Sequence, residues 1–105
     1  MLQEREVSLP QSVYDRAKED HTRTFSALMN DAFSHAVSAT RTERKAMVRI
    51  GKTYLDDGSG TIGCKYSMES ELLTQIGSTC IAERLDPPAF VVGSVAVELK
   101  LTGKT

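Results

Sequence analysis

The sequence predicts a small α+β protein, and three features of its pattern support this fold class. Apolar and polar residues alternate over residues 3–9, which is the period of a β-strand. Apolar residues then recur at helical spacing over residues 11–20 and again over 25–37. A second alternating stretch begins near residue 47, so both strands and helices are expected in this chain of 105 residues.

The strand expected at residues 3–9 turns Val7 and Leu9 toward one face, which we assign to the interior. Pro10 ends the strand because proline has no backbone N–H to donate to a neighbouring strand. The opposite face, which is directed outward, carries Glu4, Glu6 and Ser8.

Two helices are expected after this strand. The first covers residues 11–20 and buries Val13 and Ala17, with Tyr14 as an optional third member of this side, and the polar segment after it interrupts the apolar pattern. Thr24 occupies an N-cap position, and the second helix follows over residues 25–37. The apolar side of this second helix consists of Phe25, Leu28, Met29, Ala32, Phe33, Ala36 and Val37.

A polar and basic segment at residues 38–45 is either the frayed end of the second helix or a linker. We place a domain boundary near Thr42, within this segment. The first domain then covers residues 1–42 and the second covers residues 43–105.

A β-hairpin, a helix and one further element are expected in the second domain. Residues 47–55 and 61–66 alternate on either side of a run of turn-forming residues, which predicts the hairpin. After Asp86 and two prolines, which are typical of a helix start, the many valines of residues 90–101 favour a strand equally well, so both interpretations stay open. The intervening helix is expected over residues 69–84, with Leu72, Leu73, Ile76, Cys80 and Ile81 on its apolar side.

The first part of the chain is similar to a known DNA-binding family. Val7–Pro10 at the end of a strand, a short helix, a polar turn and the stretch Arg23–Phe33 resemble the ribbon-helix-helix family of bacterial, phage and plasmid repressors, antitoxins and conjugation accessory proteins. In that family a strand and two helices from each of two chains interlock, and the paired strands enter the major groove. The resemblance covers about the first 40 residues and implies an intertwined homodimer, or a higher homo-oligomer, that binds DNA. A single strand also leaves its own backbone donors and acceptors unpaired, which favours pairing with a second copy.

The resemblance implies two groups of DNA contacts, one in the ribbon and one at a helix start. A glutamate facing the groove is repelled by phosphate unless it accepts a hydrogen bond from a cytosine amino group. A slip of the strand by one residue would turn Gln3 and Arg5 outward instead. The start of the second helix offers backbone amides to a phosphate, while Arg41, Arg44 and Lys45 either add phosphate contacts or belong to a solvated linker. The implied contacts are Gln3, Glu4, Arg5, Glu6 and Ser8 in the ribbon, and Arg23, Thr24, Phe25 and Ser26 at the helix start.

An internal repeat is an alternative interpretation of the second half of the chain. Cys64–Met68 can be aligned with Arg5–Leu9. Asp86 then caps a second copy, over residues 90–99, of the helix expected at residues 25–37. This alignment needs an insertion of several residues before that helix. Tandem modules of this kind resemble conjugation accessory proteins that bind a plasmid transfer origin. The other interpretation is a small α+β domain that mediates assembly or binds a partner protein.

Composition limits the classes of function. The net charge is −1 and the isoelectric point is near 6.1, so the chain as a whole does not attract nucleic acid. No apolar run is long enough to span a membrane, and the N-terminus lacks the features of a signal peptide, which predicts a cytoplasmic protein without a membrane partner. Cys64 and Cys80 are expected to be small buried residues.

The sequence predicts no enzyme, no cofactor and no metal site. Its two histidines, His21 and His35, form no recognisable pattern with a nucleophile, and the second half lacks the ligands that a metal sensor needs. The expected function is sequence-specific DNA binding, as a transcriptional repressor or a plasmid-transfer accessory factor. The alternative is a protein-binding module, an antitoxin or a phage-encoded inhibitor, that keeps the fold only for dimerisation.

Overall fold

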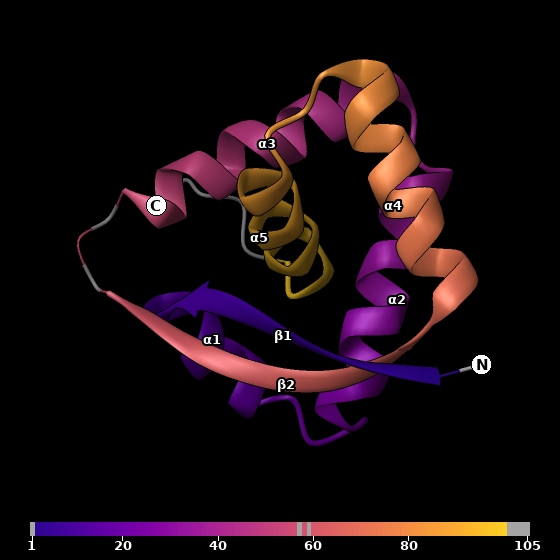
Figure 1. Cartoon of the computed structure of the whole chain (residues 1–105). Helices are drawn as coiled ribbons and strands as arrows, with labels where there is room; N and C mark the ends of the chain where they lie inside the picture. The colour runs from indigo at the N-terminus through magenta and orange to yellow at the C-terminus, as the bar shows by residue number, and fades with distance from the viewer. Residues whose placement is uncertain (1, 57, 59, 101–105) are drawn as a thin grey trace.

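The computed structural model describes residues 2–56, 58 and 60–100, and within them the order strand, helix, helix occurs twice. A separate helix, α3, joins the two units (Figure 1). The fold is α+β, as the sequence predicts. The first unit consists of β1 (Leu2–Pro10), α1 (Gln11–Lys18) and α2 (Phe25–Ser38), the connecting helix α3 spans Arg41–Leu55, and the second unit consists of β2 (Thr61–Glu69), α4 (Ser70–Glu83) and α5 (Pro87–Glu98).

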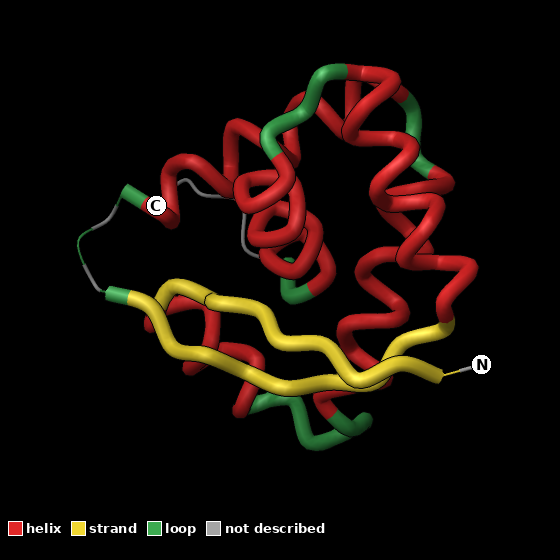
Figure 2. Tube along the Cα trace, in the orientation of Figure 1, coloured by secondary structure: helices red, strands yellow, loops and turns green. Residues whose placement is uncertain are grey.

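Strands β1 and β2 form a two-stranded antiparallel ribbon (Figure 2). They pair along their full length, and Glu6 lies opposite Lys65 with four residues of each strand on either side. The pairing is therefore symmetric about this central pair. The strand partner of β1 lies in the same chain, whereas the sequence-based expectation placed it in a second protomer.

The helices of the two units interlock. Helix α1 of the first unit packs against α5 of the second, α4 packs against α2, and α2 and α5 also contact each other. In Figure 1, α5 lies between α3 and the ribbon. A single cluster of buried side chains results, and it contains residues from both sides of the boundary that the sequence suggests near Thr42.

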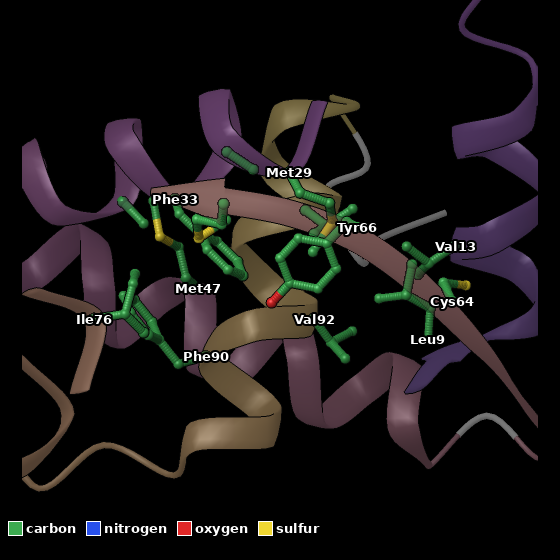
Figure 3. Close-up of a cluster of buried hydrophobic side chains, with 14 of the residues drawn as sticks. Leu9, Val13, Met29, Phe33, Met47, Cys64, Tyr66, Ile76, Phe90 and Val92 are labelled. Carbon is green, nitrogen blue, oxygen red and sulfur yellow. The ribbon is translucent and has the colours of Figure 1, made fainter. Parts of the chain in front are cut away.

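Tyr66 of β2 occupies the middle of this cluster (Figure 3). Its ring meets Phe25 edge-on, with 6.4 Å between centroids, and Phe33 in the same way at 6.2 Å. Aromatic rings favour this geometry because the positive edge of one ring faces the negative face of the other. Burial raises the pKa of the Tyr66 hydroxyl. The two ring contacts join Phe25 and Phe33 of α2 to a strand of the second unit.

The prediction of a β-hairpin over residues 47–66 is wrong, because helix α3 replaces its first strand. The Thr40 side chain accepts a hydrogen bond from the Glu43 N–H, and the Glu43 carboxylate accepts one from the Thr40 N–H, a capping box that starts the helix. Met47 and Gly51, four residues apart, then pack against α5. The expected second strand exists as β2, but it pairs with β1.

Helices α4 and α5 account for the rest of the second unit. Helix α4 is present where it is expected and buries Ile76 and Cys80, but Ile81, which we assigned to the same apolar side, is 81% exposed. Residues 87–98 form a helix, which decides between the two interpretations of this valine-rich segment. Helix α5 is buried around most of its circumference, as a helix without a polar face must be.

The backbones of α3 and α5 touch where the helices cross. A Cβ atom at Gly93 would lie 1.7 Å from the Met47 carbonyl oxygen, and one at Gly51 would lie 1.8 Å from the Ala89 carbonyl oxygen. Only glycine fits at these two positions while the helices keep this separation. The crossing fixes α3 firmly against the central helix.

Candidate nucleic-acid interface

The outward face of the ribbon is more acidic than basic. Burial alternates along β2 between the buried residues Cys64, Tyr66 and Met68 and the residues between them, which face outward. The strand pairing places the outward residues of both strands on one surface. This surface, which we call the ribbon face, carries Glu4, Glu6 and Ser8 from β1 and Gly63, Lys65, Ser67 and Glu69 from β2. Three carboxylates and one ammonium group leave it with a net charge of −2.

The strand phase is the one first expected, without a slip. Gln3 and Arg5 pair with Met68 and Tyr66, which face the core, and they lie at the edge of a hollow between β1 and α4. The ribbon face therefore contains Glu4, Glu6 and Ser8 of β1, and it does not contain Gln3 or Arg5.

The start of α2 is bound to the edge of β2. The Thr24 side chain accepts a hydrogen bond from the Ala27 N–H, with 3.1 Å between the two atoms. The Ser67 N–H donates to Ser26 Oγ at 3.0 Å, and Asn30 Nδ2 donates to the Ser67 carbonyl oxygen at 2.9 Å. The side chains of Ser26 and Asn30 thus hold α2 against the ribbon, as does the Phe25 ring through its contact with Tyr66. The phosphate contacts that the resemblance implies at Phe25 and Ser26 involve their backbone amides, and they stay a prediction.

Arg23 is surrounded by carboxylates. It donates to Asp20 at 2.9 Å, to Asp31 at 2.7 Å and to Glu98 at 2.9 Å, and its side chain is 23% exposed. The Glu98 carboxylate also lies 2.6 Å from His35 Nδ1. These acids occupy the guanidinium and repel phosphate, so the geometry leaves Arg23 to join α2 and α5 rather than to bind an anion.

A row of four exposed basic side chains follows one side of α3. The spacings of four, four and three residues place them within about 80° of one another around the helix, at about 100° per residue. Among the residues that the structure describes, none forms a salt bridge with any of the four. We call this row the basic stripe, and it consists of Arg41, Lys45, Arg49 and Lys52.

The remaining arginine of α3 anchors the helix. Arg44 Nε donates to Glu83 Oε1 at 3.0 Å, and Arg44 Nη1 donates to the Val37 carbonyl oxygen at 3.1 Å. The hydrogen bond from Arg44 lowers the pKa of the Glu83 carboxyl, and its charge acts in the same direction. The first turn of α3 is thus fastened to the ends of α2 and α4, so the basic stripe lies on a fixed support.

Charge is divided unequally between α3 and the rest of the chain. Helix α3 contains five basic residues and one acidic residue, a net charge of +4. Eight basic and thirteen acidic residues remain elsewhere, a net charge of −5. The low overall charge therefore conceals a local positive surface.

Sequence analysis found only part of this surface. Arg41 and Lys45 were expected in a linker, whereas Arg49 and Lys52 were placed on opposite faces of a strand, where they do not form a row. A signal that points to the stripe is the capping box at Thr40 and Glu43, since it marks the start of a helix at Arg41, and a helix that continues from there places the four basic residues in a row.

The described residues contain no group of three or more histidine, cysteine, aspartate or glutamate side chains placed to hold a metal ion. None of the helices in this part of the chain has the length and apolar character needed to cross a membrane. Comparisons with protein-family models, curated proteins and solved structures gave no significant match to the chain.

Proposed function

We propose that the protein binds DNA as a single-chain counterpart of a ribbon-helix-helix dimer, with the ribbon face directed into the major groove. The observation that supports this proposal is the pairing of two strand-helix-helix units about the central pair of Glu6 and Lys65, with their helices interlocked. Two chains supply these units in the family, and α3 joins them here. Transcriptional repression and an accessory role in plasmid transfer are the roles that fit such a protein.

The chemistry of the ribbon face favours base reading over phosphate attraction. Lys65 at its centre suits the acceptor atoms of guanine, and the hydroxyls of Ser8 and Ser67 bond either donors or acceptors. Glu4 and Glu6 each suit a cytosine amino group. Because the face has a net charge of −2, sequence-specific contacts must supply its preference for DNA.

Selection from a pool of random duplex DNA tests this proposal. We expect the protein to enrich a defined sequence, and Lys65→Ala to change the preferred bases at the centre of that sequence, at a cost of about 1–3 kcal/mol for the original site. Arg16→Ala is the matched control, since Arg16 is exposed on α1 and, among the described residues, forms a salt bridge with Glu19, the C-cap of the same helix, at 3.4 Å. Enrichment of no sequence, or an unchanged preference in Lys65→Ala, argues against reading by the ribbon.

The acidity of the ribbon face favours a second candidate function, binding of a basic protein surface, as in an antitoxin or a phage-encoded inhibitor. The two candidates respond oppositely to Glu4→Lys/Glu6→Lys. On duplex DNA of arbitrary sequence, where the two carboxylates read no bases, the added positive charge strengthens binding, whereas contact with a basic protein weakens.

A further inference from the structure

We propose that the basic stripe of α3 is a second nucleic-acid site, which binds the phosphate backbone of duplex DNA without regard to sequence. The observation that supports this proposal is the exposure of four basic side chains along one side of a single helix, those of Arg41, Lys45, Arg49 and Lys52. The proposal is independent of the ribbon, because it requires only α3 and the contacts that hold it.

Charge identifies a polyanion as the occupant. The stripe adds four positive charges on one face, and no described acidic side chain pairs with them. Glu83, which lies near Arg41 and Lys45, is already engaged by Arg44. With a net charge of −5 over the rest of the chain, α3 is the element to which phosphates are drawn.

The dimensions of the stripe fit a duplex. A helix rises 1.5 Å per residue, so Arg41 and Lys52 are about 16 Å apart along the axis. Phosphates of one DNA strand recur about every 3.4 Å along the duplex axis, so about five steps of the backbone pass the stripe. Long, exposed arginine and lysine side chains can reach phosphates on both sides of the helix axis.

The support of the stripe is rigid. Arg44 fastens the first turn of α3, and the contacts at Gly51 and Gly93 hold its second half against α5. Because the backbone of α3 is already fixed, only the side chains of the stripe lose conformational entropy when they bind a rigid polyanion. Helix α3 and the ribbon lie on either side of α5 in Figure 1, so the stripe is carried by an element separate from the ribbon.

Fluorescence anisotropy with a labelled duplex of arbitrary sequence, measured from 50 to 200 mM salt, tests the proposal. If all four side chains of the stripe neutralise phosphates, affinity falls about 150-fold over this range. Lys45→Gln/Arg49→Gln removes two of these contacts, so the fall becomes about 12-fold, and binding at 50 mM salt weakens to the same extent on every sequence.

The matched control is Arg16→Gln/Lys18→Gln, which changes the net charge of the protein by the same amount on another exposed helix, α1. We expect this variant to retain the salt dependence of the wild type. Circular dichroism verifies that both double variants keep their helix content.

Three results would overturn the proposal: an unchanged salt dependence in the α3 variant, an equal effect of the α1 variant, or binding to vesicles of anionic lipid without binding to DNA. Failure of the ribbon proposal is distinguishable, because Lys65→Ala changes sequence preference whereas the α3 variant changes affinity on all sequences alike.

Discussion

Arg23 and Arg44 both lie next to helix ends, and both use their guanidinium groups inside the fold. Arg23 connects α2 to Glu98 of α5, and Arg44 connects α3 to Glu83 of α4. Each is less than one quarter exposed and bound to carboxylates, so neither contributes a free charge to the surface. The exposed arginines and lysines of α3 have no such carboxylate partners among the described residues, so position decides which cations stay free at the surface.

Asp20 offers a test at this scale. Hydrogen bonds from the Thr22 hydroxyl and the Thr22 N–H, followed by Arg23, lower the pKa of the Asp20 carboxyl from its ordinary 3.8 to about 2. Because the pKa is depressed in the folded chain, the contribution of Asp20 to stability is present above its ordinary pKa and is lost as pH falls toward 2. Thr22→Val, which removes the largest cause, should move the pKa back toward 3.8.

Titration of the Asp20 carboxyl by NMR checks this expectation. His21 is adjacent and exposed, so His21→Gln is a suitable control that should leave the pKa of the Asp20 carboxyl at about 2. A wild-type carboxyl that titrates at its ordinary pKa would contradict the hydrogen-bonded geometry.

At the scale of elements, the crossing of α3 and α5 is the most sensitive contact of the fold. Gly93→Ala puts a methyl group against the backbone of α3, so the helices must separate, and we expect a loss of about 3 kcal/mol in the free energy of unfolding. Gly77→Ala is the matched control, because a Cβ at Gly77 of α4 meets nothing within 4 Å. That change should stabilise the protein by about 1 kcal/mol.

Urea denaturation of the two variants measures both effects. Equal stabilities of Gly93→Ala and the wild type would show that α3 is not held at this distance from α5.

The elements that local chemistry specifies were predictable from the sequence. Thr24 caps α2, and Val13 and Ala17 are buried in α1, as their positions indicate. Helix α3 was missed because Val48, Ile50 and Tyr54 also fit a strand, and the capping pair of Thr40 and Glu43 was not used. Ile81 was misplaced for a related reason, since a short apolar helix does not reveal which of its apolar residues will find a neighbour.

At the scale of the whole molecule, the partner of β1 has a measurable consequence. A ribbon formed within one chain does not require association, so the thermal midpoint should stay constant over about a hundredfold range of protein concentration. A ribbon shared between two chains would instead gain about 2.7 kcal/mol over that range, and its midpoint would rise by several degrees. Calorimetry at low and high concentration distinguishes the two.

The internal-repeat alternative anticipated the order strand, helix, helix in the second half of the chain, but the pairing of its strand with β1 could not be predicted, for a physical reason. Strand pairing is chosen by contacts between residues about sixty positions apart, and Cys64–Met68 fits a hairpin with its sequence neighbour as well as a ribbon with β1. The basic stripe shares this dependence, since its four side chains form a row only after α3 is known to be a helix.

The central pair of the ribbon has an implication for symmetry. In a homodimer the residue on the two-fold axis must face its own copy, so a charged residue there always meets a like charge, which is destabilising. Joining both halves in one polypeptide lifts that restriction, and here an acid faces a base, Glu6 across from Lys65. Each half can therefore change alone, and a substitution in one strand is not duplicated in the other.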